Sequence, residues 1–260
     1  MQTLTLSHDN HTAIITLSRP HKKNAMDFVM MQELIKTARH IKADKSVRAV
    51  IITGGTDFCS GLDLAVFGSP KNMIFATKEL IKPAPSLFQK VCLIWQSLPV
   101  PVIAVVDGVC LGAGLQLAMG ADVRISHPSA TWSVLEAKWG LVADMGLTRL
   151  ARDIGKDKLK ELAMSARLLD AETAYDYGLI THIDDEPMAR AKALADEIAT
   201  RSPDAVLASK HLINRMHPSD HLTLYQEKLW QLKLFASHNR KLAIKKAKDM
   251  AVAFRDRQWG

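Results

Sequence analysis

The sequence predicts an α/β fold, in which strands and helices alternate along the first part of the 260 residues. Two observations carry this prediction. Apolar, β-branched runs such as Ala49–Thr53 and Val102–Val106 have the length and composition of buried strands, and stretches between them, such as Phe28–Ala43, carry apolar residues at helical spacing. With 48% hydrophobic residues, the chain can also bury a sizeable core.

The elements of the first part follow from these two patterns, taken in chain order. Short β-branched runs bounded by polar or turn residues predict strands, and longer amphipathic or buried stretches predict helices. This recurring strand-and-helix unit favours one stacked core, and no low-complexity linker divides it. The expected strands are Leu4–Leu6, Ala13–Leu17, Ala49–Thr53, Val102–Val106 and Val123–Ser126, and the expected helices are Phe28–Ala43, Lys78–Ser97 with prolines near its start, and Leu115–Met119.

The C-terminal part has a different character, because strand signals fade from about Leu159 onward. Apolar residues there recur at helical spacing, which predicts a helical region. The expected helices are Asp170–Tyr177, Met188–Arg201, Pro203–Asn214 and Leu222–Phe254.

The most informative stretch is Pro101–Asp122, where an apolar strand runs through a glycine-rich junction into a helix. Gly112, Ala113 and Gly114 form the junction. Small residues let a ligand approach the main chain, and the first free N–H groups of a helix favour negative charge. No Walker loop or G-x-G-x-x-G fingerprint is present, which argues against a site for a nucleoside triphosphate or NAD. Taken alone, the junction fits an oxyanion site, a phosphate cradle or a tight structural turn.

A second segment, Val47–Leu64, also runs from an apolar strand through glycines to a short loop. Together with Ile14–Asp27, these segments resemble the crotonase family, also called the enoyl-CoA hydratase/isomerase superfamily. The likeness continues through Trp132–Gly146 and Leu168–Ile180, so several motifs occur in family order over nearly the whole chain.

The resemblance implies a crotonase-like spiral of ββα turns, followed by a helical C-terminal region that makes trimer contacts. It therefore predicts a core at residues 1–195 that carries the CoA and catalytic site, a helical region at residues 196–260, and a homotrimer or hexamer. Composition and periodicity show neither the spiral nor the trimer.

Chemistry in the family rests on two backbone N–H groups that hold the thioester oxygen as it becomes an enolate. By match to the motifs, these are expected to be the amides of Leu62 and Ala113. Each such donor is typically worth about 3–4 kcal/mol at a developing oxyanion. Ala113 stands where the family usually has glycine. An alanine would be strained there at positive φ, but an ordinary helix-start conformation would accept it.

The expected acid/base positions begin with Gln116 and Glu136. A typical hydratase has a glutamate at both matching positions. A glutamine can hold a water by hydrogen bonding, but it cannot take up a proton at any useful pH. The sequence therefore departs from the two-carboxylate pattern of hydration.

Asp144 follows Glu136 by eight residues, in a segment that resembles that of dienoyl-CoA isomerases. In those enzymes the matching glutamate and aspartate move protons between the two ends of a conjugated system. This chain differs from them at Gln116, where the dienoyl-CoA isomerases have an aspartate. Each residue also has a non-catalytic interpretation. Asp144 would then cap a helix at Gly146–Arg152, and Glu136 would be an ordinary surface residue. Asp63 is expected to cap a short helix and shape the oxyanion loop.

The resemblance also implies contacts to coenzyme A, which is part of the substrate, so no separate cofactor is expected. One stretch of the chain matches the family's residues near the adenine, and a C-terminal Phe and Lys/Arg pair matches residues that approach the nucleotide, often from a neighbouring subunit. The expected CoA-binding residues are Lys23, Asn24, Ala25, Ser60, Leu64, Phe254 and Arg257.

The formal charge of +7 and a basic cluster at Lys241–Lys248 invite a nucleic-acid hypothesis. No aromatic platform accompanies the cluster, so an acidic small ligand is favoured over RNA. Cys59, Cys92 and Cys110 lack metal-ligand spacing and are expected to be buried small residues, and no histidine pair suggests a metal site. No apolar run approaches the roughly 20 residues that span a bilayer, so a soluble, cytoplasmic protein is expected.

These observations predict an acyl-CoA enzyme that stabilises a thioester enolate and moves protons with Glu136, helped by Asp144. Isomerisation of an enoyl- or dienoyl-CoA is the leading reaction, and enoyl-CoA hydration is the alternative, because the surrounding motifs are shared. A hypothesis of a different class is a catalytically weakened acyl-CoA- or RNA-binding protein, which Gln116 and the positive charge motivate.

Overall fold

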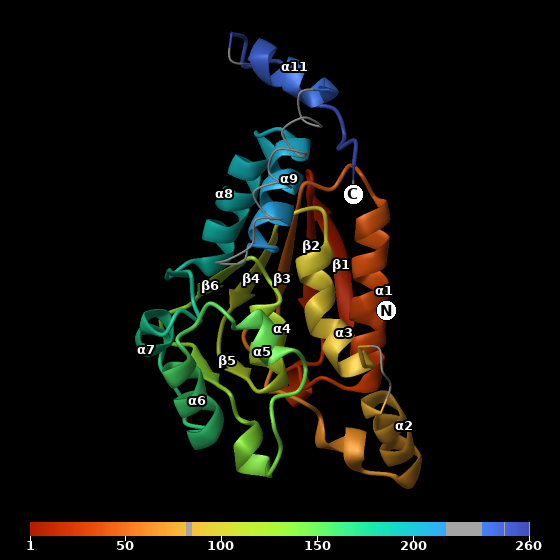
Figure 1. Cartoon of the computed structure of the whole chain (residues 1–260), viewed down its shortest axis with the longest axis vertical. Coiled ribbons are helices and arrows are strands. Elements are labelled where there is room, and N and C mark those ends of the chain that lie inside the picture. Colours follow the sequence, from red (N-terminus) through yellow and green to blue (C-terminus); the bar gives the residue numbers. More distant parts are fainter. Residues whose placement is uncertain (82–84, 217–235, 247, 260) are drawn as a thin grey trace.

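A six-stranded sheet forms the centre of the protein (Figure 1). The computed structural model describes residues 1–81, 85–216, 236–246 and 248–259. β1 and β2 are antiparallel, and every later neighbour in the sheet is parallel. The strands in spatial order are β1 (Leu4–Asp9), β2 (Thr12–Leu17), β3 (Ala49–Thr53), β4 (Val102–Val106), β6 (Val123–Ser126) and β8 (His182–Ile183). A second sheet pairs β5 (Val109–Leu111) with β7 (Thr131–Ser133).

Helices cover both faces of the central sheet and extend beyond it (Figure 1). The α-helices are α1 (Phe28–Ala43), α2 (Pro70–Leu80), α3 (Leu87–Leu93), α4 (Ala113–Met119), α5 (Leu147–Leu150), α6 (Lys156–Ser165), α7 (Ala171–Asp176), α8 (Pro187–Ala199), α9 (Pro203–Ile213) and α11 (His238–Lys246). The 3-10 helices are η1 (Pro20–Lys22), η2 (Leu64–Phe67), η3 (Ile94–Ser97) and η4 (Glu136–Trp139). The predicted α/β class is confirmed.

Burial on both faces explains the unbroken apolar runs of the central strands. Alternate residues of a strand point to opposite faces. In β3, Val50 and Ile52 belong to the large core that includes α1, α3 and α4, whereas Ala49 and Ile51 belong to the core under α8. α8 contributes small side chains such as Ala191 to that second core. No position of β3 is exposed, so a period of two is not visible in its sequence.

Most predicted elements of the first part are confirmed within a few residues. Three strands and the first helix, at Phe28–Ala43, have the predicted bounds. That helix begins sharply because the Asp27 carboxylate accepts a hydrogen bond from Met30 N at 2.8 Å. The strands β5, β7 and β8 are absent from the prediction, since two or three residues carry no readable period.

The prediction of one helix at Lys78–Ser97 is wrong. The chain forms α2 and α3 instead, and residues 82–84 between them lie outside the described residues. α3 begins with a capping box, in which the side chains of Ser86 and Gln89 each accept from the other's main-chain N–H. α2 begins with Ser69 as cap and Pro70 in its first turn, which is a start signal that the prediction overlooked.

The C-terminal part is helical, as predicted, but the tail is not. The predicted helix Leu222–Phe254 lies partly outside the described residues; its described part contains α11, and residues 252–257 have no regular structure. The tail returns to the body, where Arg257 donates to the carbonyls of Lys42, Asp44 and Val47. Figure 1 accordingly places the C-terminal end beside the end of α1. A division at residue 195 stays a prediction, and α8 continues across it.

Helix α9 is tied to the sheet by a partly buried ion pair. Lys210 Nζ lies 2.6 Å from Asp122 Oδ2 and also donates to the carbonyls of Trp95 and Val100, at 3.0 and 2.9 Å. The same carboxylate oxygen accepts from Val102 N at 2.8 Å. The pair therefore joins α9 to the start of β4.

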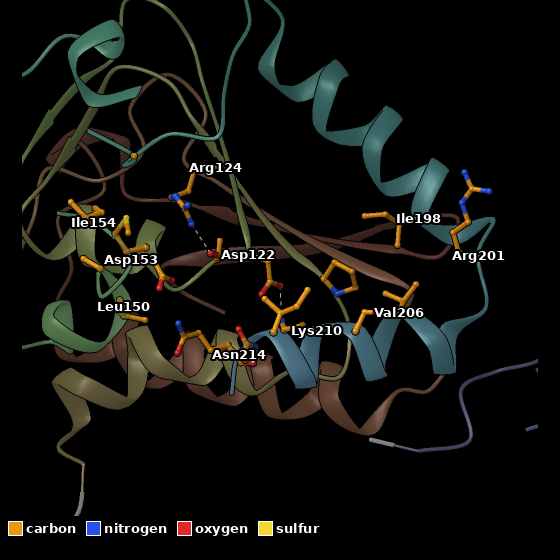
Figure 2. Close-up of a pocket in the computed structure, with 18 of the residues that line it drawn as sticks. Asp122, Arg124, Leu150, Asp153, Ile154, Ile198, Arg201, Val206, Lys210 and Asn214 are labelled. Carbon is orange, nitrogen blue, oxygen red and sulfur yellow. Dashed lines mark hydrogen bonds and ion pairs between the residues drawn. The ribbon is translucent and has the colours of Figure 1, made fainter. Parts of the chain in front are cut away.

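This ion pair lies beside a cavity of about 670 Å³, shown in Figure 2. Arg124 lies on the same cavity, and its guanidinium donates to the carbonyls of Leu179 and Ala121 at 2.7 and 2.9 Å. Lys210, Asp122 and Arg124 all have protein partners. Their charges therefore hold the fold together at this place.

Replacing Lys210 tests that conclusion. Lys210→Met should lower the free energy of unfolding by roughly 3 kcal/mol, because Asp122 and two carbonyls lose a shielded partner. Lys192, which pairs with Asp9 at 2.8 Å on the surface, is the matched control. Lys192→Met should cost less than about 1 kcal/mol. Urea unfolding measures both, and equal losses would contradict the anchoring role of Lys210.

Candidate active site

Two loops that follow neighbouring strands meet at one end of the central sheet. The loop after β3 runs beside β5, because Cys59 N donates to Val109 O at 2.9 Å and Leu111 N donates to Cys59 O at 3.0 Å. The position that a Cβ would take on Gly61 lies 3.9 Å from Ala113 N. The two loops that carry the predicted oxyanion donors are therefore adjacent.

The structure explains why a small residue stands at each position of the junction. Gly112 has φ +51° and ψ −115°, a conformation that residues with a side chain rarely adopt. A Cβ on Gly114 would lie 2.4 Å from Cys59 O, so glycine is needed for α4 to approach this loop. Ala113 is the first residue of α4 and does not have positive φ. The alanine at this position is accommodated without backbone strain.

The amides of Leu62 and Ala113 have no acceptor among the described residues. Met26 N donates to Gly61 O at 2.8 Å, and Met26 O accepts from Asp63 N at 2.9 Å, so the N–H of Leu62 points away from Met26. Ala113 lies in the first turn of α4, whose N–H groups lack partners within the helix. Neither amide donates to another group in the described part of the chain, and both residues line one cavity.

Asp63 fixes the loop that carries Leu62. Its carboxylate accepts from Ala65 N at 3.0 Å, which caps η2 as predicted, and from Arg19 Nη2 at 2.9 Å. Burial opposes ionisation of Asp63, but these hydrogen bonds and the positive charge of Arg19 lower the pKa of its carboxyl. Arg19 also pairs with Asp27, the cap of α1, at 3.3 Å. The motif containing Arg19 is conspicuous in the sequence, but this anchoring role is visible only in the structure.

A cavity of about 580 Å³ lies beside the two free amides. This volume is within the range of small-molecule sites. Apolar side chains such as Phe88 and Met145 form part of its wall, and the three predicted acid/base residues, Gln116, Glu136 and Asp144, also line it. The structure thus brings together acid/base groups and main-chain donors that are far apart in the sequence.

Gln116 connects two parts of this cavity wall. Its side chain is 1% exposed. Its Nε2 donates to Glu136 Oε1 at 2.7 Å, and its Oε1 accepts from Met145 N at 2.9 Å. The sequence suggests that Gln116 could hold a water, but in the structure both ends of the amide bind protein groups. The second oxygen of the carboxyl, Glu136 Oε2, is buried and has no hydrogen-bond partner in the described part of the chain.

Burial raises the pKa of Glu136. The hydrogen bond from Gln116 works against this rise, and the negative charge of Asp144 adds to it. Neighbouring groups around the cavity also raise the pKa of Asp144 by partial desolvation, although the residue as a whole is exposed. Asp144 is not the cap of α5, because Gly146 occupies that position without a side-chain hydrogen bond. Glu136 is not a surface residue either, since it is only partly exposed and held by Gln116.

The predicted CoA contacts fall into two groups. Ala25, Ser60 and Leu64 line the cavity. Lys23 and Asn24 do not, and both support the loops around it: Lys23 O accepts from Ser60 N at 2.9 Å, and Asn24 Nδ2 donates to two carbonyls of the loop after β3. Their contact with CoA stays a prediction.

Three further residues bear on the binding of CoA: Lys22, Phe254 and Arg257. Lys22 lines the cavity, half-exposed and 3.9 Å from Asp63, although it is absent from the predicted set. Its place beside Lys23 is the signal that could have found it. Phe254 and Arg257 do not line the cavity of their own chain; Phe254 lies under Lys246, and Arg257 is buried against main-chain carbonyls. Contact from a neighbouring subunit stays a prediction.

Other expectations concern the cysteines, metals and membranes. Cys59, Cys92 and Cys110 are buried and free, as predicted. In the described ranges, no group of three or more His, Cys, Asp or Glu side chains could hold a metal ion. None of the helices in those ranges is both long and apolar enough to cross a bilayer.

Comparisons with known proteins identify the family. The sequence pattern described as enoyl-CoA hydratase/isomerase matches residues 7–260. The mitochondrial Delta(3,5)-Delta(2,4)-dienoyl-CoA isomerase of Mus musculus is 35% identical over 230 residues, covering 83% of this chain and 68% of that protein. The mitochondrial methylglutaconyl-CoA hydratase of Mus musculus is 34% identical over 211 residues, covering 78% of this chain and 65% of that protein.

A solved structure shows the same fold. The enoyl-CoA hydratase from Bacillus anthracis matches with a TM-score of 0.88 and 26% identity, covering 98% of this chain and 99% of that one. The chain therefore belongs to the enoyl-CoA hydratase/isomerase family, the crotonase superfamily, and has the crotonase fold. Its relatives include both isomerases and hydratases.

The raised pKa of Glu136 predicts a dependence of stability on pH. Because folding raises this pKa above its ordinary value of 4.5, the folded protein holds the proton more tightly than the unfolded chain does. The resulting contribution to stability is present below the ordinary value and is lost as pH rises through the folded value. At neutral pH, Glu136→Gln should therefore raise the free energy of unfolding, on the order of 1 kcal/mol.

Urea unfolding measured from acid to neutral pH tests this effect. The gain from Glu136→Gln should vanish at acid pH, where both side chains are neutral. Glu197→Gln, at an exposed residue that pairs with Arg201, is the control and should show no such pH-dependent gain. A Glu136→Gln protein that is less stable than wild type at neutral pH would contradict the burial of this charge.

Proposed function

We propose that this protein isomerises an enoyl- or dienoyl-CoA through a thioester enolate. In this proposal the amides of Leu62 and Ala113 donate to the thioester oxygen as negative charge develops there. Each such donor contributes typically about 3 kcal/mol to the stability of the oxyanion. The lack of an acceptor for either amide in the part of the chain that the structure describes supports this role.

Glu136 moves the proton in the proposed reaction. As a carboxylate it removes a proton from the carbon next to the thioester, and the electron pair of the broken C–H bond delocalises onto the thioester oxygen. A proton returned further along the chain completes the double-bond shift, with no net change in atoms. A raised pKa brings a carboxyl closer to neutral pH, where it can both accept and donate. Asp144, on the same cavity, is the proposed partner for a conjugated substrate.

The observation that carries the preference for isomerisation is the hydrogen bonding of Gln116. Hydration requires a water that is held by two groups and deprotonated by at least one. Gln116 cannot deprotonate water, and both ends of its amide bind Glu136 and Met145. Asp63 is a third carboxylate on the cavity, beside Glu136 and Asp144, and it is bound by Arg19 and Ala65. The remaining pair, Glu136 and Asp144, suits proton movement along a substrate.

Hydration of a 2-enoyl-CoA is the second candidate. The similarity to hydratases from Mus musculus and Bacillus anthracis favours it, because the family to which this chain belongs includes both reactions.

The proposal extends to the ligand and the assembly. Coenzyme A is part of the substrate and no separate cofactor is needed. We place Ala25, Ser60 and Leu64 at the CoA moiety, with Lys23 and Asn24 supporting them. A homotrimer or hexamer in the cytoplasm would bring Phe254 and Arg257 near the nucleotide of a neighbouring subunit.

Comparing three substrates tests this proposal. The purified protein should convert 3-enoyl- or 3,5-dienoyl-CoA faster than it hydrates 2-enoyl-CoA in steady-state assays. Asp144→Asn should selectively slow dienoyl isomerisation, and Gln116→Glu should raise hydration by supplying a second carboxyl. Glu136→Gln should slow every reaction by roughly 10²–10⁴, as expected for loss of general acid–base catalysis.

The controls separate chemistry from folding and binding. Asp153→Asn, at an exposed residue outside this cavity, should leave all rates unchanged. Calorimetry with a non-reactive acyl-CoA should give similar affinities for wild type and Glu136→Gln. Wild-type hydration that outruns both isomerisations, or an Asp144→Asn protein with all rates intact, would overturn the preference for isomerisation.

A further inference from the structure

The orientation of the Gln116 side chain is fixed by its neighbours. Met145 N–H can only donate, so the amide oxygen of Gln116 must face it, at 2.9 Å. The amide nitrogen then faces Glu136 Oε1, at 2.7 Å. Flipping this buried amide would place two donors against each other at Met145, and would therefore break a buried hydrogen bond.

This orientation makes the two oxygens of Glu136 unequal. Oε1 accepts an N–H from Gln116, and that N–H cannot accept a proton in return. Oε1 therefore stays an acceptor whether the carboxyl is ionised or neutral. Oε2 has no hydrogen-bond partner in the described residues. When Glu136 is neutral, its proton sits on Oε2.

Gln116 supplies the side-chain donor of this carboxyl, beside the main-chain N–H groups of Glu136 and Leu135. The junction contributes main chain only, since the Cβ position of Gly112 lies 3.4 Å from Glu136 Oε1. The segment before α5 contributes Asp144, whose negative charge raises the pKa of Glu136. α3 contributes Cys92, whose thiol has a pKa raised by burial and remains neutral. Burial and Asp144 therefore favour the neutral carboxyl, whereas Gln116 and the main-chain N–H groups of Glu136 and Leu135 favour the ionised one.

We propose that Gln116 is a positioning residue that confines the transferable proton of Glu136 to Oε2 and ties that carboxyl to the segment carrying Asp144. Gln116 itself takes up and releases no proton. Its effect on turnover rests on the proposed acyl-CoA chemistry, whereas its effect on the titration of Glu136 does not.

Infrared titration of the unliganded protein tests this role directly. The C=O band of neutral Glu136 is identified as the band that Glu136→Gln removes. Gln116→Leu removes the donor at similar size, and should raise the pKa of Glu136 by about 1 to 2, because a hydrogen bond to the charged form favours ionisation. The rising limb of kcat/KM against pH should move upward by the same amount.

Two further variants make the outcome decisive. Gln116→Glu keeps an acceptor for Met145 N but places a second carboxyl against Oε1, so the two groups should share one proton and titrate in two separated steps. Leu117→Met, a buried volume-conserving change on the same helix, should leave the band and the pH profile unchanged.

An unchanged titration of Glu136 in a folded Gln116→Leu protein would overturn the proposal. If that variant does not fold, a single titration step at the wild-type position in Gln116→Glu would overturn it equally. If the titrations shift as expected but wild type turns over none of the three acyl-CoA substrates, the proposed function fails and the placement of the proton stands.

Discussion

The structure of the site depends on one main-chain interaction, the pairing of the loop at Cys59 with β5. β3 and β4 are parallel neighbours, so the chain leaves both at the same edge of the sheet. The hydrogen bonds of Cys59 to Val109 and Leu111 then hold the chain after β3 beside the chain after β4. Each of the two loops carries an N–H group, at Leu62 and at Ala113, that has no partner within the described ranges of the chain. Side-chain identity matters little for those donors, whereas the glycines that permit the approach matter greatly.

The acid/base side of the cavity follows a different principle. A carboxyl that is removed from water resists ionisation, and burial and the nearby Asp144 both raise the pKa of Glu136. The amide of Gln116, together with main-chain N–H groups, opposes both effects, and it also binds one oxygen of the carboxyl. Its second hydrogen bond, to Met145 N, connects Glu136 with the segment that carries Asp144. One neutral side chain thus connects the Glu136 carboxyl with the segment that carries the Asp144 carboxyl.

The sequence predicts those parts in which local pattern and burial agree. β3, β4 and α1 have continuous signals and sharp boundaries, so their bounds are correct. The predicted helix Lys78–Ser97 instead runs through the cap at Ser86 and the proline before it, and so joins the end of α2 to α3. The bridge made by Gln116 could not be predicted, because one of its partners is a main-chain N–H 29 residues away. Arg257 likewise binds only carbonyls, which leave no mark on the sequence.

The central claim is that the free amides of Leu62 and Ala113 receive the oxygen of an acyl thioester. The most direct measurement is the C=O stretching frequency of a saturated acyl-CoA, labelled with ¹³C at the thioester carbonyl and bound to the protein. Two donors polarise the carbonyl, so the account predicts a shift to lower frequency than that of the same thioester in water. A bound acyl-CoA whose thioester band stays at its solution frequency would contradict it.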